Sequence, residues 1–199
     1  MLANILDTFN KGGYVMYPIV LCSILSLAVA VERFLFYHER DTSKDLLQKL
    51  VSLLDGGKTL EAHELALKGK GDCAEVSAYY LGNSKVDVDK LETKAQLMID
   101  SYDEHLIFLN IVVTIAPLLG LLGTILGMIS SFKVFDLRAG QPFAITAGIG
   151  EALIATAFGL TVAIFALVLY GFLKYQAGKL SKKLMQWCAI LESAERNGE

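Results

Sequence analysis

Residues 141–173 read QPFAITAGIGEALIATAFGLTVAIFALVLYGFL and contain one charged side chain, Glu151. About 20 apolar residues suffice to cross a hydrocarbon core of roughly 30 Å, so this stretch predicts a membrane-spanning helix. A carboxylate inside such a helix is costly to place in lipid and by default indicates a functional site. Glu151 is therefore the first candidate functional residue of the chain.

Two further uncharged stretches, residues 12–31 and 106–132, are also long enough to span a membrane. The 199-residue chain is 54% hydrophobic, and its charges are cleanly separated from these stretches. We therefore predict an all-α integral membrane protein with three spans. A cleaved signal peptide is the alternative for the first stretch, because Ala28-Val29-Ala30 has a small-x-small pattern. We expect a retained span, since the stretch is too long for a signal peptide and follows no basic cluster.

Lysine and arginine are distributed unevenly between the two sides of these spans. Residues 38–105 hold nine and residues 174–199 hold five, whereas the opposite side holds only Lys11, Lys133 and Arg138. Because basic residues are retained in the cytoplasm during insertion, we expect an external N-terminus and a cytoplasmic C-terminus.

Charged residues at the cytoplasmic ends of the spans are expected to meet the lipid surface. We predict that Arg33 extends to the headgroups beside Glu32. We also predict that the lysines after the third span, Lys174, Lys179, Lys182 and Lys183, meet anionic headgroups.

Seven segments follow from these assignments. They are a short periplasmic N-terminus (1–11), a span (12–37), a cytoplasmic helical segment (38–105), a span (106–132), a periplasmic loop (133–142), a span (143–173) and a cytoplasmic helical tail (174–199).

Capping residues predict several helices within the cytoplasmic segment. Thr42 or Ser43 begins one helix, Thr59 begins a second, and Gly82-Asn83 ends a third. A further helix from Asp87 or Asp89 is expected to continue into the second span. We therefore expect long cytoplasmic extensions of the membrane helices.

Side chains that commonly bind metals or catalyse reactions are scattered along the chain. The three cysteines and three histidines lack metal-ligand spacing, and there is no phosphate-binding loop or nucleophile motif. We therefore predict no enzyme activity, metal or cofactor, and no nucleic-acid partner.

Small residues line one face of the second span and one face of the third at helical spacing. The positions are Ala116, Gly120, Gly127 and Ser131 in the second span, and Gly148, Ala152, Ala155, Gly159, Ala163 and Ala166 in the third. Such stripes allow helix backbones to approach closely in lipid, so we assign them to helix packing.

Three polar residues accompany these stripes and form a candidate ion pathway. Thr124 lies on the stripe of the second span, while Glu151 and Thr156 flank that of the third. Thr124 and Glu151 each lie about 12 Å from the outer end of their span, and Thr156 lies roughly 7 Å deeper. A protonated Glu151 that only joins subunits is the alternative interpretation.

Two motifs resemble the signature spans of the ExbB/TolQ/MotA proton-channel family. They are APLLGLLGTILGMISSF at residues 116–132 and GIGEALIATAFGLTVAI at residues 148–164. The number of spans resembles the ExbB/TolQ branch, because MotA-type stators have four. Matched by motif, Thr124, Glu151 and Thr156 correspond to polar positions that face the channel or the partner. Pro117 corresponds to the proline that opens the second-span motif.

Two residues depart from the family pattern. Phe165 stands where the family usually has a proline, so a proline kink is not expected at that point. Gly150 stands where alanine or serine is common. Neither departure removes a polar group from the proposed pathway.

The resemblance implies a homopentameric ring in the bacterial inner membrane, enclosing a dimer of an ExbD/TolR-like single-span partner. The partner's aspartate would take up protons, and a TonB/TolA-like protein would carry the resulting force to outer-membrane import or envelope maintenance. A stand-alone ion channel or transporter and a structural scaffold are the alternatives. The sequence separates neither Ton-like from Tol-like clients nor proton from sodium.

Overall fold

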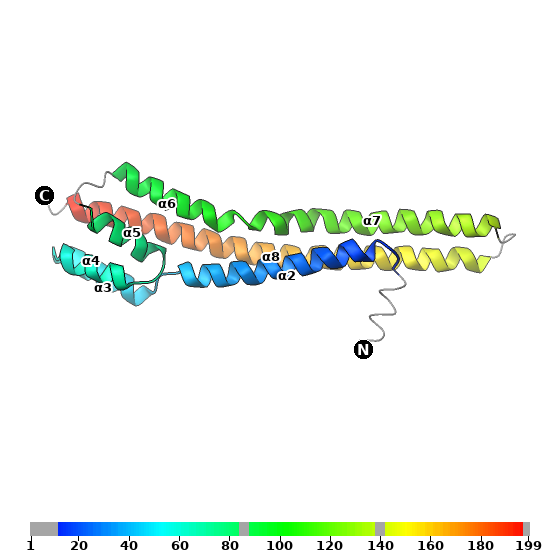
Figure 1. Ribbon diagram of the computed structural model, residues 1–199, viewed down its shortest axis with the longest axis horizontal. Helices are drawn as coiled ribbons and strands as arrows, with labels where there is room; N and C mark the ends of the chain where they lie inside the picture. The colour runs from blue at the N-terminus through cyan, green and yellow to red at the C-terminus, as the bar shows by residue number, and fades with distance from the viewer. Residues whose placement is uncertain (1–11, 84–87, 138–141, 197–199) are drawn as a thin grey trace. The chain divides into compact units, whose positions relative to one another are not determined.

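The computed structural model describes residues 12–83, 88–137 and 142–196, and the regular secondary structure of these residues is entirely α-helical (Figure 1). The predicted segment 1–11 lies outside the described residues. The helices are α2 (Met16–Arg40), α3 (Lys44–Asp55), α4 (Thr59–Lys68), α5 (Asp72–Leu81), α6 (Val88–Asp103), α7 (Leu106–Leu137) and α8 (Pro142–Arg196).

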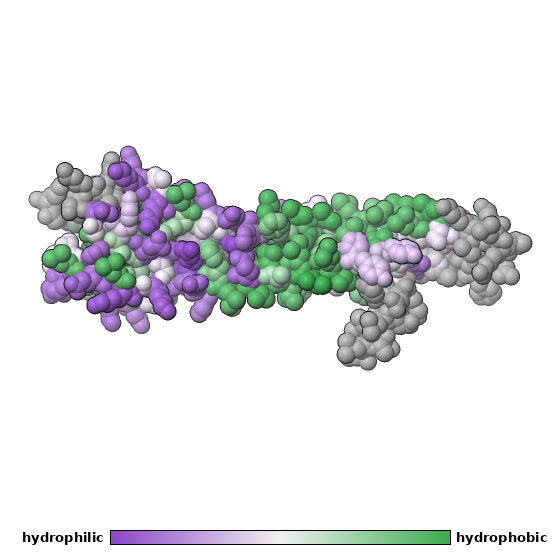
Figure 2. Space-filling model, in the orientation of Figure 1, coloured by the Kyte–Doolittle hydropathy of each residue, from purple (hydrophilic) through white to green (hydrophobic). Residues whose placement is uncertain are grey.

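The chain forms two compact units. The span unit comprises Met1–Ala30 and Leu106–Gly171, and the polar unit comprises Val31–His105 and Phe172–Glu199. Three helical stretches, Met16–Asp55, Val88–Phe132 and Gly148–Ala194, are long and apolar enough to cross a membrane. The predicted all-α fold with three spans is therefore confirmed. In Figure 2 the surface over the spans is hydrophobic, whereas the polar unit is largely hydrophilic.

In the span unit, α7 and α8 run antiparallel and meet through small residues. A Cβ atom at Gly120 would lie 3.0 Å from the Cα atom of Thr156, and one at Gly127 would lie 3.1 Å from the Cβ atom of Ala152. These separations leave no room for larger side chains. The register sets Thr124, halfway between the two glycines, level with the turn of α8 that follows Glu151.

The polar unit has a core of large apolar side chains. Leu184, Trp187 and Leu191 of α8 are almost fully buried against α3, α4, α5 and α6. The indole nitrogen of Trp187 donates a hydrogen bond of 2.6 Å to the hydroxyl of Ser77. The single polar group of this large buried side chain is therefore paired.

Helix starts in the polar unit agree only partly with the sequence. Ser43 caps α3 by accepting a hydrogen bond from the Leu46 amide, and Gly82 follows α5, as predicted. The prediction that Thr59 caps α4 is wrong, because the cap position is Lys58 and Thr59 is the first helical residue. Thr42 accepts a hydrogen bond of 3.1 Å from the Cys73 amide and so caps α5, a different helix from the one it precedes.

The predicted continuous helix into the second span is also wrong. Helix α6 ends at Asp103 and α7 begins at Leu106, with a turn at Glu104 and His105. By contrast, α8 continues without interruption over 55 residues, as expected for a span joined to a helical tail.

Candidate functional site

Thr156 joins α8 to α7 by a hydrogen bond between helices. Its hydroxyl donates to the carbonyl oxygen of Gly120 over 2.9 Å. The proton of this half-buried hydroxyl is therefore committed within the chain, but the lone pairs of its oxygen can still accept a hydrogen bond. Thr156 can thus pack helices and solvate a cation or proton at the same time.

Thr124 bonds to its own helix. Its hydroxyl donates to the carbonyl oxygen of Leu121 over 2.6 Å. Threonines in membrane helices often bond in this way, so the interaction does not by itself indicate function. As with Thr156, the oxygen lone pairs are left as acceptors. Thr124 lies level with the turn of α8 that follows Glu151, and it is bonded neither to Glu151 nor to Thr156 in the part of the chain that the structure describes.

The carboxylate of Glu151 lies against Gly13, a residue that the sequence did not single out. Gly13 has a φ of 72°, in the left-handed region that favours glycine. A Cβ atom at Gly13 would collide with Oε1 of Glu151 and lie 3.2 Å from its Cδ atom. The only signal in the sequence is the pair Gly12-Gly13 directly before the first span.

The predicted helix-packing residues lie where α7 and α8 approach most closely. A Cβ atom at Gly159 would come within 2.6 Å of the backbone oxygen of Ala116, and one at Gly148 would collide with the hydroxyl of Ser131. The Cβ atom of Ala155 faces Gly123, Ala152 faces Gly127, and Ala163 joins a small cluster with Val112, Ala116 and Ala166. Pro117 lies half-buried inside α7.

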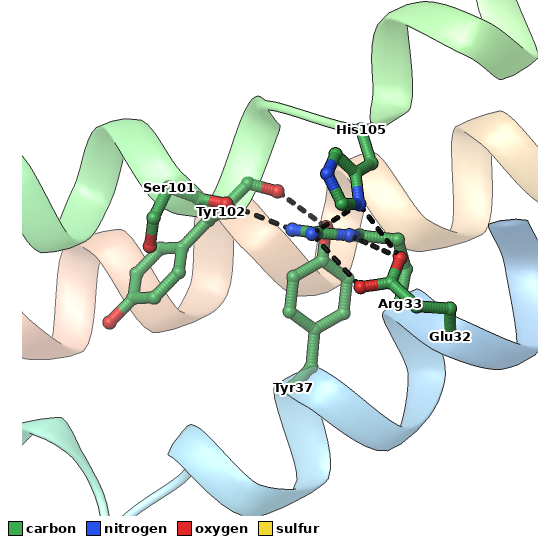
Figure 3. A network of polar contacts seen from close by, with 6 residues as sticks. All are labelled: Glu32, Arg33, Tyr37, Ser101, Tyr102 and His105. Carbon is green, nitrogen blue, oxygen red and sulfur yellow. Dashed lines mark hydrogen bonds and ion pairs between the residues drawn. The ribbon is translucent and has the colours of Figure 1, made fainter.

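A second polar cluster, in the polar unit, centres on Arg33 (Figure 3). Its guanidinium donates to Glu32 at 2.9 and 3.1 Å and to the carbonyl oxygen of Ser101 at 2.9 Å. It also contacts Nδ1 of His105 at 2.7 Å. Arg33 is only 3% exposed, so the prediction that it extends to the lipid headgroups is wrong.

Arg33 points inward because the end of α6 offers it unpaired carbonyl groups. The last carbonyl groups of a helix lack partners within it. Arg33 satisfies that of Ser101, and the Tyr37 hydroxyl donates to that of Tyr102 over 2.7 Å. Side chains from α2 thus cap α6 at the point where the helix breaks.

Two of the tail lysines form ion pairs within the polar unit. Lys174 contacts Asp103 and Lys183 contacts Asp41, each at 2.6 Å. The headgroup contact of the four tail lysines stays a prediction.

A buried carboxylate organises the centre of the polar unit. Asp72, 2% exposed, accepts hydrogen bonds from Arg40 over 2.9 Å and from the Tyr102 hydroxyl. Burial and the bond to Asp72 raise the pKa of Tyr102, and Asp72 also raises the pKa of Arg40. Burial raises the pKa of the neighbouring Cys73 thiol to about 12. Asp72 of α5 thus joins Arg40 of α2 and Tyr102 of α6.

Comparison with known proteins places these features in a family. The MotA/TolQ/ExbB proton channel family matches residues 81–186, a range that includes both span motifs. The chain belongs to this family. The resemblance seen in the two motifs is therefore confirmed, and with its three apolar helices the chain is a multi-pass membrane protein of the ExbB-like kind.

Several relatives named for biopolymer transport support this membership. A protein named ExbB-like 1 from Synechocystis is 34% identical over 183 residues, covering 84% of this chain and 69% of the relative. The biopolymer transport protein ExbB of Aquifex aeolicus is 37% identical over 112 residues, covering 56% and 73%. An ExbB-like 1 protein of Helicobacter pylori is 28% identical over 196 residues, covering 97% and 99%.

Proposed function

We propose that this ExbB-family chain is the ring-forming subunit of an ion-driven motor in the bacterial inner membrane, with its N-terminus in the periplasm. The observation that carries the proposal is the hydrogen bond of Thr156 across the α7–α8 contact, with Glu151 five residues earlier on α8 and its carboxyl group against Gly13. An intramembrane carboxylate and a hydroxyl with free lone pairs lie within about two helical turns of each other, in a family of proton channels.

The proposed motor needs further copies of the chain and a second protein. Two helices of one subunit cannot enclose a pore, so several copies are required, and the family resemblance favours five. No aspartate occurs in residues 12–31, 106–132 or 141–173. The titrating aspartate of the motor would therefore belong to an ExbD/TolR-like dimer inside the ring, and a TonB/TolA-like protein would receive the force.

The chemistry at the site is proton solvation. The hydroxyl oxygens of Thr124 and Thr156 accept hydrogen bonds from water, which passes a proton to or from the partner's aspartate. Glu151 offers a hydrogen-bonding partner to an adjacent charged or polar group. One proton that crosses a potential of 100 mV releases about 2.3 kcal/mol, so repeated steps supply the work.

Substitutions on α8 test this function. Glu151→Gln and Thr156→Val are expected to leave the complex assembled, as measured by native mass spectrometry with the single-span partner, and to abolish energised transport. Thr161→Val is the matched control, because the exposed hydroxyl of Thr161 bonds to its own helix at Ala157 over 2.7 Å. Full transport by both Glu151→Gln and Thr156→Val would contradict the proposal.

The alternatives give different results in the same experiments. A stand-alone channel or transporter would conduct ions in vesicles that contain only this chain. A structural scaffold would form its oligomer and show no dependence on Glu151. Native mass of the complex with and without the partner would also count the subunits, and five copies with two of the partner is the expected stoichiometry.

A further inference from the structure

The turn that leads into the first span lies against the side chain of Glu151. Residues 12–15 precede α2, and the Met16 amide donates to the carbonyl oxygen of Gly13 over 3.2 Å. This bond closes the turn at the residue whose backbone faces the carboxylate. Among the residues that the structure describes, the nearest atom to an added Cβ at Gly13 is Oε1 of Glu151, so the carboxyl group lies directly against the backbone.

Packing on both sides holds this turn in place within the span unit. A Cβ atom at Gly12 would lie 3.4 Å from the Cγ2 atom of Ile154 on α8, and one at Gly123 on α7 would lie 3.6 Å from the Cβ atom of Val15. Val15 and Met16 are buried, and Met16 is 0% exposed. The turn therefore packs against α7 and α8. It cannot move away from Glu151 without breaking its contacts with these two helices.

From this geometry we propose that Gly13 is a positioning residue for Glu151. The bare backbone of Gly13 sets the direction of the carboxylate and holds it beside the start of α2. The inference rests on the proposed function of Glu151 and extends it, because it makes the first span part of the ion site. Neither span motif contains Gly13.

Two physical effects support a role for glycine here. The first amides of a helix have no acceptor within it, and the helix dipole is positive at that end, so a carboxylate is favoured beside it. An alanine at position 13 would both collide with the carboxylate and strain a backbone with φ of 72°. Only the collision acts on Glu151. Controls must therefore separate the collision from the backbone strain.

The chain offers a matched control for each effect. Gly57 has a φ of 70° with nothing within 4 Å of an added Cβ atom, so Gly57→Ala reports backbone strain alone. Gly150 is next to Glu151, and none of the described residues lies within 4 Å of an added Cβ atom there, so Gly150→Ala reports a change beside the carboxylate without a collision.

The test measures the reactivity of Glu151 as well as ion flux. Full-length chains are expressed with the single-span partner, and membranes are treated with dicyclohexylcarbodiimide, whose addition to Glu151 is followed by mass spectrometry. Gly13→Ala is expected to speed this modification at least threefold, because the displaced carboxylate becomes accessible, and to lower proton flux at least tenfold. Gly57→Ala and Gly150→Ala are expected to match the unaltered protein. A modification rate in Gly13→Ala equal to that of the controls would overturn the inference.

A double substitution covers the case in which Gly13→Ala does not assemble. Glu151→Asp shortens the side chain and removes the collision, so the Gly13→Ala, Glu151→Asp protein should assemble better than Gly13→Ala alone. Backbone strain at position 13 remains in the double variant, so the deciding comparison is with Gly13→Ala: assembly no better than that of Gly13→Ala alone would overturn the inference. Glu151→Gln and Thr156→Val separate the two hypotheses. Full transport by both contradicts the proposed function, while the carbodiimide rates still decide whether Gly13 positions Glu151.

Discussion

The span unit and the polar unit hold their helices together in opposite ways. In the span unit, α7 and α8 meet through glycine and alanine, with backbone atoms of one helix about 3 Å from the Cβ positions of the other. In the polar unit, the helices meet through leucine, tryptophan and tyrosine, and through charged networks around Arg33 and Asp72. Apolar side chains gain little by leaving lipid for a helix contact, so close backbone packing replaces hydrophobic burial in the membrane.

The largest effect is expected at the closest backbone approach of the span unit. Gly159→Val would drive a side chain into the backbone oxygen of Ala116, which a Cβ atom alone would approach to 2.6 Å. Because a backbone atom cannot rotate away as a side chain can, we expect a loss of about 3 kcal/mol. The loss would appear as a lower thermal midpoint and lower yield of the detergent-extracted complex.

Gly171→Val is the control on the same helix, since nothing lies within 4 Å of an added Cβ atom at Gly171. It is expected to keep the thermal midpoint of the unaltered protein. Equal midpoints for the two variants would remove the distinction between the units, because close packing would then not hold α7 to α8.

A smaller effect is expected when the charged network of the polar unit is cut. Arg33→Gln would leave the carbonyl oxygen of Ser101 without its charged donor and would remove the ion pair between Glu32 and Arg33, while Glu32 keeps its contact with Nδ1 of His105 at 3.0 Å. We expect a loss of about 2 kcal/mol, the range for hydrogen bonds to charged groups. Hydrogen exchange measured by mass spectrometry should accelerate first at the end of α6.

Lys58→Gln removes an exposed ion pair with Glu61 and serves as the comparison. Its expected effect is below about 0.5 kcal/mol, because exposed pairs are screened by solvent. If Arg33→Gln were no more destabilising than Lys58→Gln, the polar unit would be held by its apolar core alone.

Among the three main predictions, the smallest effect per residue is a loss of stability at alkaline pH in the polar unit. Burial raises the pKa of Cys73 to about 12 and that of Cys188 to about 11, from an ordinary value of 9.0. Because the folded pKa lies above the unfolded one, this stability is complete below pH 9 and is lost as the pH rises toward 11–12. At pH 10 we expect a loss of about 1 kcal/mol per thiol.

Denaturant midpoints between pH 8 and 10.5 measure this loss, and a Cys73→Ala, Cys188→Ala protein should show a shallower decline. An identical decline in that protein would show that the thiols are not responsible.

Hydropathy and motif spacing predicted much of the fold because both are local properties. Uninterrupted apolar runs gave the three spans, and Ser43 and Gly82 marked helix ends that the structure confirms. The prediction for Arg33 was wrong because its position at the end of a span is equally compatible with a lipid-facing or an inward side chain. Only the unpaired carbonyl group of Ser101, supplied by another helix, draws it inward.

In the candidate site, too, local features could be predicted from the sequence and contacts between helices could not. Residue types and spacing were enough to name Thr124, Glu151 and Thr156 and to assign the small residues to packing, since each property repeats within one helix. The acceptor of the Thr156 hydroxyl, the cap that Thr42 gives to α5 and the seat of Glu151 on Gly13 join residues from different helices. Such contacts depend on how the helices are placed against one another, and local periodicity carries no information about that placement.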